Sequence, residues 1–223
     1  MRIAMKYFGI LVGICFILAT GCSQTPNPAS SPSNHDHSSH QMNGQEHAHH
    51  QHETMERGEA SDMSIYNLDG QWENQRSEKI RLGDDKGQVV VLAMIYASCK
   101  GACPRIIADM RRIEDECKSK HPGHVRYKLV TFDPEVDTPE KLQKLAEDSG
   151  LGSDWELLRG SSEQALELSA LLGVKYRKTN ETDYAHSNII TVLNGEGEIA
   201  FQQEGLGVKP DETVAAVEKL LGK

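Results

Sequence analysis

The segment Gln88–Pro104, QVVVLAMIYASCKGACP, is the part of the chain that most clearly indicates the fold. Its first part, Gln88–Tyr96, is a nearly continuous apolar run, which is typical of a central strand buried on both faces of a sheet. A helix is predicted from Pro104 to about Lys118, because proline suits a first helical turn and apolar residues recur there at helical spacing. The apolar stripe of this helix consists of Ile106, Met110, Ile113 and Cys117. A buried strand therefore leads directly into a helix.

The rest of the chain from residue 64 onward continues this alternation of strands and helices. Strands are predicted at Ser64–Leu68, Val125–Phe132, Trp155–Leu158, Asn188–Leu193 and Glu198–Gln203, and helices at 139–148, Ser162–Leu172 and Asp211–Leu221. Alternating units give parallel strands, and the turn at Asn194–Gly197 joins the last two strands as an antiparallel hairpin. The fold class is therefore α/β, a thioredoxin-like sandwich with a mixed central sheet and flanking helices.

Two cysteines lie at the junction between the buried strand and its helix. Ligands of open α/β sheets collect at this carboxyl end of the strands. Cys99 and Cys103 are four apart, so their sulfurs can approach one ion or form one disulfide. The helix N-terminus and Lys100 favour a thiolate. The alternative, two inert structural cysteines, fits a polar loop poorly, whereas Cys117 on the apolar stripe is predicted to be buried.

Two thiolates suit a soft metal ion, and Cu(I) is the softest common candidate. The chain beyond residue 62 offers three histidines as a third donor. His121 and His124 are predicted on the surface at the opposite end of the sheet. His186 precedes the strand that opens the C-terminal hairpin, and in a thioredoxin-like fold this loop packs against the cysteine loop. We therefore predict a metal site formed by Cys99, Cys103 and His186, with an ordinary surface histidine as the alternative for His186.

The N-terminus has the pattern of an export signal. Arg2 and Lys6 flank the start of an apolar run, Tyr7–Ala19, which is shorter than the ~20 residues that a bilayer requires. The run ends at Thr20-Gly21-Cys22, which resembles a bacterial lipoprotein processing box. Residues 1–22 are predicted to be a lipoprotein signal peptide with Cys22 lipidated. An uncleaved anchor or a plain secretory signal are the alternatives, and both also place the rest of the protein outside the cytoplasm.

Residues 23–62 are predicted to be a disordered, His-rich tether, because they are polar and lack apolar periodicity. Seven of the ten histidines lie here, and we call them the tail histidines: His35, His37, His40, His47, His49, His50 and His52. They predict weak collection of copper, zinc or nickel, with a plain solvated spacer as the alternative. Residues 63–223 form the predicted thioredoxin-like copper-binding domain. The net charge of −9 and the lack of basic blocks exclude nucleic acid as a partner.

Three motifs in the predicted domain together resemble the Sco/SenC/PrrC family over roughly residues 64 to 222. The motifs are Cys-x-x-x-Cys-Pro at Cys99–Pro104, Asp-Pro-x-x-Asp-Thr-Pro at Asp133–Pro139 and His-Ser at His186-Ser187. The resemblance implies that Cys99, Cys103 and His186 are the ligands of one copper ion, Cu(I) or Cu(II). It also places Asp133 and Asp137 on an acidic loop near the site, with turn formation and helix capping as their alternative role.

The resemblance further implies a function. Members of this family are thioredoxin-like and tethered to a membrane, outside the cytoplasm or in the mitochondrial intermembrane space. They assist assembly of the copper-A centre of cytochrome c oxidase by donating copper, by reducing its cysteines, or by both. The implied partners are cytochrome c oxidase subunit II and a lipid membrane, and the implied location is the cell membrane, facing the periplasm or the cell exterior.

The chain also departs from the family pattern. The family usually has an aromatic-rich strand end, often a proline after the first cysteine, and commonly Val-Asp before the histidine. Here these positions are Met94-Ile95-Tyr96, Lys100 and Tyr184-Ala185. The departures leave open a related copper enzyme, or another redox pathway, as the client.

Two functions remain in view from the sequence. In the first, the protein is a copper chaperone and not an enzyme. In the second it is a thiol–disulfide reductase, in which the Cys99 thiolate attacks a client disulfide and Cys103 resolves the mixed disulfide. Three residues between the cysteines, instead of the usual two, and the presence of His186 favour the chaperone. A peroxide-reducing enzyme is disfavoured, because no Thr-x-x-Cys arrangement is visible.

Overall fold

The structure, a computed structural model, describes residues 63–222. The predicted signal peptide (1–22), Cys22 and the His-rich tether (23–62) lie outside the described residues. The elements in chain order are η1 (Ile65–Asn67), β1 (Trp72–Asn74), β2 (Lys79–Ile80), η2 (Leu82–Asp85), β3 (Val89–Ile95), α1 (Ala102–Lys120), β4 (Val125–Thr131), α2 (Pro139–Asp148), β5 (Trp155–Arg159), α3 (Ser162–Leu171), β6 (Tyr176–Lys178), β7 (Tyr184–His186), β8 (Ile189–Leu193), β9 (Ile199–Glu204) and α4 (Asp211–Leu221).

The central sheet is mixed, with the strand order β2-β1-β5-β4-β3-β8-β9. Strand β4 pairs in parallel with both β3 and β5. Strand β8 runs antiparallel to β3, and β9 antiparallel to β8. The carboxyl ends of β3 and β4 therefore meet the start of β8 at one edge of the sheet. This edge brings together the cysteine loop, the acidic loop and the segment that precedes β8.

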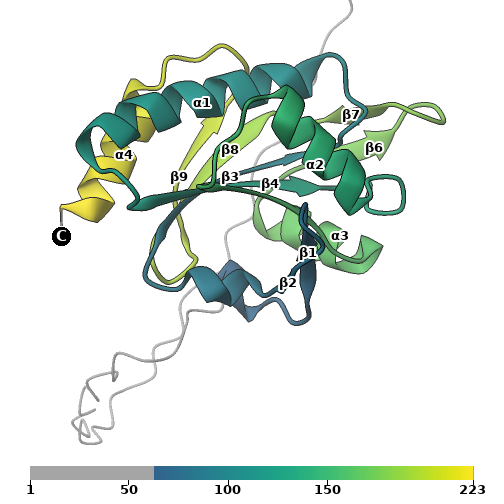
Figure 1. Cartoon of the computed structure of the whole chain (residues 1–223), viewed down its shortest axis with the longest axis horizontal. Helices are drawn as coiled ribbons and strands as arrows, with labels where there is room; N and C mark the ends of the chain where they lie inside the picture. Colours follow the sequence, from purple (N-terminus) through teal and green to yellow (C-terminus); the bar gives the residue numbers. More distant parts are fainter. Residues whose placement is uncertain (1–62, 223) are drawn as a thin grey trace, which may run out of the picture. The chain divides into compact units, whose positions relative to one another are not determined.

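Helices cover both faces of the sheet (Figure 1), with α1 and α4 together on one face and α3 on the other. The sheet supplies the core, since every residue of β3 and of β8 is buried. The predicted apolar stripe of α1 is buried as well, including Cys117. The architecture confirms the predicted thioredoxin-like sandwich with a mixed sheet and flanking helices.

Most predicted elements occur within one or two residues of their expected bounds, but the first one was wrong. Ser64–Leu68 was predicted as a strand, and the structure has the 3₁₀ helix η1 there. The Ser64 hydroxyl accepts a hydrogen bond from the backbone N–H of Tyr66, and the Leu68 N–H bonds to the Ile65 carbonyl. A serine cap thus closes a turn that buries Ile65, and this local bonding outweighs the apolar alternation.

The sequence did not predict four short strands, β1, β2, β6 and β7. The first two form a hairpin whose turn is fixed by Asn74, since its side-chain oxygen accepts hydrogen bonds from the N–H groups of Arg76 and Glu78. The last two form a separate two-stranded sheet beside the central one. His186, expected in a loop, is the last residue of β7.

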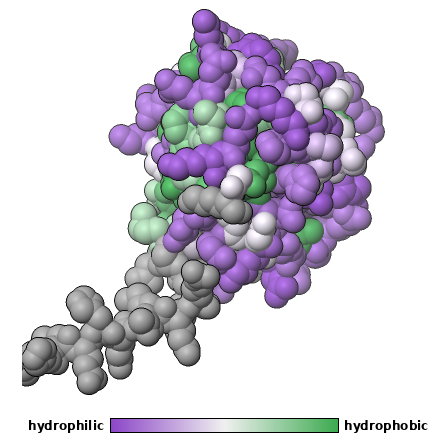
Figure 2. Space-filling view, turned by 90° about the vertical axis from the view of Figure 1, so that its left-hand side faces the viewer, coloured by the Kyte–Doolittle hydropathy of each residue, from purple (hydrophilic) through white to green (hydrophobic). Residues whose placement is uncertain are grey.

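The outer surface of the domain is mainly hydrophilic on the face that Figure 2 shows, with small hydrophobic areas between polar side chains. Within residues 63–222, none of the helices combines the length and the apolar composition that crossing a bilayer demands.

Candidate metal centre

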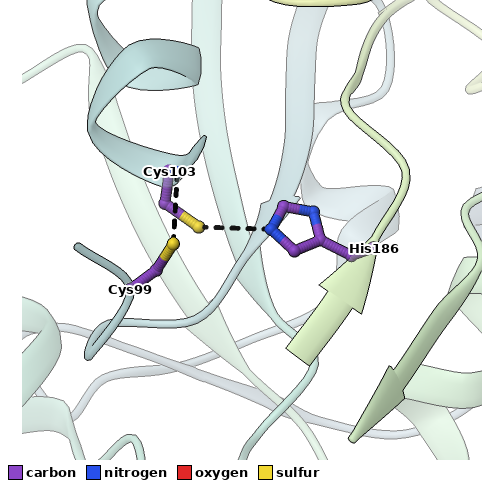
Figure 3. Close-up of side chains that lie close together, drawn as sticks. All are labelled: Cys99, Cys103 and His186. Carbon is purple, nitrogen blue, oxygen red and sulfur yellow. Dashed lines mark hydrogen bonds between the residues drawn. The ribbon is translucent and has the colours of Figure 1, made fainter. Parts of the chain in front are cut away.

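Three side chains from two distant parts of the chain converge at the carboxyl edge of the sheet. The sulfurs of Cys99 and Cys103 and one ring nitrogen of His186 all lie within 4.8 Å of one another. The Cys103 Sγ–His186 Nε2 distance is 3.9 Å. Figure 3 shows both thiols and the imidazole pointing toward a common space. Among the described residues, this is the one group of three or more Cys, His, Asp or Glu side chains close enough to share a metal ion.

The start of α1 positions the two thiols. Gly101 is the N-cap residue and has no side chain to accept a hydrogen bond from the first turn. The Cys99 sulfur takes this place and accepts the backbone N–H of Cys103, with an N–S distance of 3.3 Å (Figure 3). The thiol thus satisfies an N–H group that the helix itself leaves unpaired, and the positive end of the helix dipole faces the sulfur. Cys103 is buried, and Cys99 is half-buried.

The β6–β7 sheet positions the imidazole, and an aromatic cluster holds that sheet in place. Phe132, at the end of β4, stacks on Tyr176 with ring centroids 4.7 Å apart. It also contacts the rings of Tyr184 and His186, at 5.2 and 5.3 Å. Tyr96, at the end of β3, meets the His186 ring edge-on at 6.0 Å. The ligand histidine is therefore packed against the ends of the two central strands.

The acidic loop anchors both halves of the site. The buried carboxylate of Asp137 accepts hydrogen bonds from the Ala97 backbone N–H, at 2.8 Å, and from the Thr131 hydroxyl. Asp137 therefore fixes the turn that carries Cys99. Asp133 lies close to Tyr184 of the β6–β7 sheet. The burial of Tyr184 is the largest cause that raises its pKa to about 12, and the charge of Asp133 and its hydrogen bond with Tyr184 add to the effect. Both aspartates support the site from outside it, while Thr138 caps α2.

The two thiols differ in acidity. Burial on its own raises the pKa of Cys99, but hydrogen bonds from the backbone N–H groups of Cys103 and Gly101, and from the side chains of Cys103 and Tyr96, outweigh it and lower the pKa to about 7. Burial, followed by the proximity of Cys99, raises the pKa of Cys103. Cys99 is therefore the predicted ionisable thiol, and Cys103 ionises when a cation arrives.

The imidazole presents a lone pair to the thiols. Its Nδ1 lies 2.8 Å from the Ser187 backbone carbonyl oxygen. A carbonyl oxygen accepts hydrogen bonds only, so Nδ1 carries the proton of the neutral ring and Nε2 is free to coordinate. A hydrogen bond from the remote ring nitrogen to a backbone carbonyl is the usual way in which proteins orient a metal-binding histidine.

The spacing of the donors fits a metal ion. Bond lengths of about 2.3 Å to sulfur and about 2.0 Å to nitrogen, known from zinc sites, separate the two atoms by about 3.7 Å at an angle of about 120°. The Cys103 Sγ–His186 Nε2 distance of 3.9 Å is close to this value. Two thiolates and one imidazole form a soft donor set, which suits Cu(I) or Zn²⁺ and excludes Mg²⁺ and Ca²⁺ as preferred ions.

The acidity of Cys99 gives a direct prediction. In the metal-free, reduced protein, the rate of Cys99 alkylation by iodoacetamide should rise with pH and reach half its maximum near pH 7, because the thiolate is the nucleophile. Mass spectrometry of the alkylated peptides measures this rate. Cys117 is the internal control, since it is buried and burial raises its pKa to about 11. Equal rates at Cys99 and Cys117 at pH 7 would contradict the described environment.

The three residues of the cluster are those predicted from the sequence, and the structure places His121 and His124 at the opposite end of the sheet, between α1 and β4. The aromatic cluster of Tyr96, Phe132, Tyr176 and Tyr184 was not predicted. The signal was present in Tyr176 and Tyr184, which both precede the histidine, but only the pairing of β6 with β7 shows that the three side chains share a face.

Comparisons with known proteins show the family of this chain. The family model described as SCO1/SenC matches residues 60–222. The SCO1 protein homolog of Bacillus subtilis (strain 168) is 25% identical over 149 residues, which cover 64% of this chain and 76% of that protein. The structure of Arabidopsis thaliana ScoI with copper bound is similar to this chain with a TM-score of 0.61 at 18% identity. The match covers 70% of this chain and 98% of the ScoI chain.

A further solved structure comes from BsSco, whose description names a disulfide switch and membership of the Sco family of cytochrome c oxidase assembly proteins. It has a TM-score of 0.62 at 23% identity and covers 70% of this chain and 93% of its own. At these identities the solved structures establish the thioredoxin-like fold, and the family model, which spans most of the chain, establishes the kinship. The chain belongs to the SCO1/SenC family.

Proposed function

We propose that this protein is a copper chaperone that carries one copper ion on Cys99, Cys103 and His186 and delivers it to a client protein. The observation that carries the proposal is the convergence of two thiols and one imidazole lone pair within 4.8 Å. Copper is the metal of choice because two sulfurs and one nitrogen form a soft, low-coordinate donor set. The copper-bound structure of Arabidopsis ScoI, which shares the fold, supports this choice.

The ion is cargo, and the arrangement of the residues favours its release. His186 stands on a small sheet of its own, whereas the thiols belong to the loop and helix that follow β3. Three side chains leave one side of the ion open. A ligand atom of the client can therefore bind the copper before any bond between copper and this protein breaks. Copper can then pass by exchange of one ligand at a time.

We further propose that the client is subunit II of cytochrome c oxidase, whose copper-A centre the protein helps to assemble, or a related copper enzyme. The description of BsSco as a member of a family of oxidase assembly proteins supports this client. The N-terminal sequence supports action at the cell membrane, facing the periplasm or the cell exterior, through a lipid on Cys22.

The difference in acidity between the two thiols favours a second function, thiol–disulfide reduction. A thiol with a pKa of about 7 next to a buried thiol of raised pKa is the arrangement of an attacking and a resolving cysteine. The description of BsSco names a disulfide switch, which supports this alternative. The two activities are compatible, because only the reduced pair binds Cu(I).

The test uses the full chain with Cys22→Ser, to prevent lipidation, and with the tail histidines changed to asparagine. The reduced protein should retain one equivalent of Cu(I) after gel filtration. On mixing with the copper-free, reduced copper-A domain of an oxidase subunit II, it should generate the visible spectrum of that centre. Retention of copper equal to that of a matched Cys99→Ser/Cys103→Ser variant would refute the proposal.

The tail histidines lie outside the described residues, and their role is a separate proposal. We expect the chain with its native tail to bind several further equivalents of Cu(II) weakly, because neutral imidazoles are good copper ligands. Isothermal titration of the native tail and of the His→Asn tail measures the difference. An identical number of bound Cu(II) ions in the two proteins would show that the tail is only a spacer.

A further inference from the structure

The basic side chains around the metal centre lack the ion pairs that most other basic side chains form. Most lysines and arginines elsewhere in the described residues, such as Lys79, Arg112 and Lys118, form ion pairs with carboxylates, and the exceptions are Arg111, Lys141, Lys209 and Lys219. Among residues 63–222, five exposed cations near the metal centre form no such pair: Lys100, Arg105, Lys175, Arg177 and Lys178. Their charges are therefore not neutralised by a neighbouring carboxylate, although the chain as a whole carries a net charge of −9.

These cations stand on both sides of the three ligand residues. Lys100 lies between the two cysteines, and Arg105 lies in the first turns of α1. A cation at a helix N-terminus is unfavourable, because it faces the positive end of the helix dipole. No acidic residue occupies the first turn of α1. The stability of α1 therefore does not explain why the cations are here; Lys100 favours a thiolate of the site, and an external negative charge would explain the others.

On the histidine side, the cations flank a groove in the β6–β7 sheet. The groove has a volume of about 380 Å³ and is lined by Lys175, Tyr176, Arg177, Ala185, His186 and Ser187. Strand alternation sends Lys175 and Arg177 to the face opposite Tyr176, which packs on Phe132. Small side chains at 185 and 187 leave the space between the two cations open. His186 borders this groove between Ala185 and Ser187, and its ring, opposite Tyr176 in the pairing of β6 with β7, lies on the other face with Phe132 and the metal centre.

Carboxylates of this chain at the same edge of the sheet do not neutralise the cations of the groove. Asp133 and Asp137 are buried. Asp183 is held in the β6–β7 turn by hydrogen bonds from Asn180 and Thr182. Glu135 and Glu181 are exposed, but neither lines the groove. The groove thus presents two cations and no acid.

We propose that this groove, together with Lys100 and Arg105, is the docking surface for a protein partner that carries carboxylates beside its own copper-accepting thiols. The proposal rests on the proposed function as a copper donor. A carboxylate of the partner binds Lys175 and Arg177 on the face of the β6–β7 sheet opposite Tyr176. Ala185 and Ser187, the chain neighbours of His186, line the same groove. The partner's thiols then approach the copper from the open side, between the histidine and the cysteines.

Charge complementarity of this kind acts mainly on the rate of encounter. Steering by complementary charges raises association rates about 10- to 1,000-fold at low ionic strength. The effect falls steeply with salt, since the screening length is ~10 Å at 0.1 M and ~3 Å at 1 M. The affinity of the protein for copper itself should not depend on Lys175 or Arg177, because neither contributes a donor atom.

The test compares copper transfer to two synthetic acceptor peptides with the same pair of cysteines, one flanked by glutamates and one by lysines. The donor is the copper-loaded full chain with Cys22→Ser and the tail histidines changed to asparagine. At low salt, transfer to the glutamate peptide should be at least about 10-fold faster than to the lysine peptide, and the ratio should approach one at about 1 M salt. Lys175→Glu/Arg177→Glu should abolish the preference.

The control is Lys144→Glu/Lys219→Glu, which changes the net charge equally at exposed positions on α2 and α4. It should keep the preference, and both double variants should keep the copper affinity of the parent in a chelator competition.

Failure of the parent to bind copper refutes the proposed function. Normal copper binding with equal transfer to the two peptides refutes the docking surface alone. Loss of binding to phosphatidylglycerol vesicles in Lys175→Glu/Arg177→Glu, without any peptide preference in the parent, would assign the groove to a lipid headgroup and overturn the proposal.

Discussion

Replacing His186 with alanine is expected to weaken copper binding by more than about 100-fold, which exceeds the roughly 10- to 100-fold that the loss of an outer-shell partner costs. The reason is geometric. The imidazole supplies the one nitrogen donor of the three, and its Nε2 lies 3.9 Å from the Cys103 sulfur. Without it, two thiolates remain, and the affinity falls to that of an isolated dithiol. Competition with a chelator of known affinity measures the change.

The matched control for this prediction is His124→Ala. His124 is an exposed histidine between α1 and β4, at the other end of the sheet from the cysteines. It should leave copper affinity unchanged. Circular dichroism should show the same fold in both variants, since neither side chain belongs to the hydrophobic core. Equal affinity in His186→Ala and His124→Ala would remove the histidine from the site.

Replacing Phe132 with alanine is expected to lower the free energy of unfolding by about 3–5 kcal/mol, the usual cost of removing a buried phenylalanine. Phe132 is 3% exposed. Its ring contacts Tyr176, Tyr184 and His186, so the substitution removes the support of the whole β6–β7 sheet. Urea denaturation measures the loss of stability.

A second substitution at the same position separates support of the site from support of the fold. Phe132→Leu keeps most of the apolar volume but loses the stacking on Tyr176. The variant should therefore remain folded, and its affinity for copper should be lower than that of the parent. Phe201→Ala is the control, because this phenylalanine is half-buried on β9 and makes no ring contact with the aromatic cluster. Parental copper affinity in folded Phe132→Leu would show that the aromatic cluster does not position the histidine.

The central part of the fold could be predicted because its signals are local. The apolar run of β3, the proline and apolar stripe of α1, and the proline at the start of α2 each follow from residues within the element itself. The two cysteines could be placed for the same reason, since they lie at a strand–helix junction that the run and the stripe define. Their chemistry then followed from the residue types.

The rest could not be predicted because it depends on distant partners. Strands β6 and β7 have three residues each, and their pairing is decided by the packing of Tyr176 and Tyr184 on Phe132, more than forty positions earlier in the chain. The sequence predicts an acidic thiol at this helix start, but that it is Cys99 depends on the hydrogen bonds from Tyr96 and from the backbone at the start of α1, which only the structure shows. The expected topology was enough to place His186 near the two cysteines, whereas its element, the end of β7, is visible only in the structure.

X-ray absorption spectroscopy of the copper-loaded protein tests whether Cys99, Cys103 and His186 together bind the copper ion. The sample is the full chain with Cys22→Ser and the tail histidines changed to asparagine, so that the copper signal comes from one site. For this three-ligand site we expect two sulfur neighbours and one imidazole nitrogen around a single copper ion, with the nitrogen lost in His186→Ala. A first shell without nitrogen in the parent, or one that His186→Ala leaves unchanged, would contradict it.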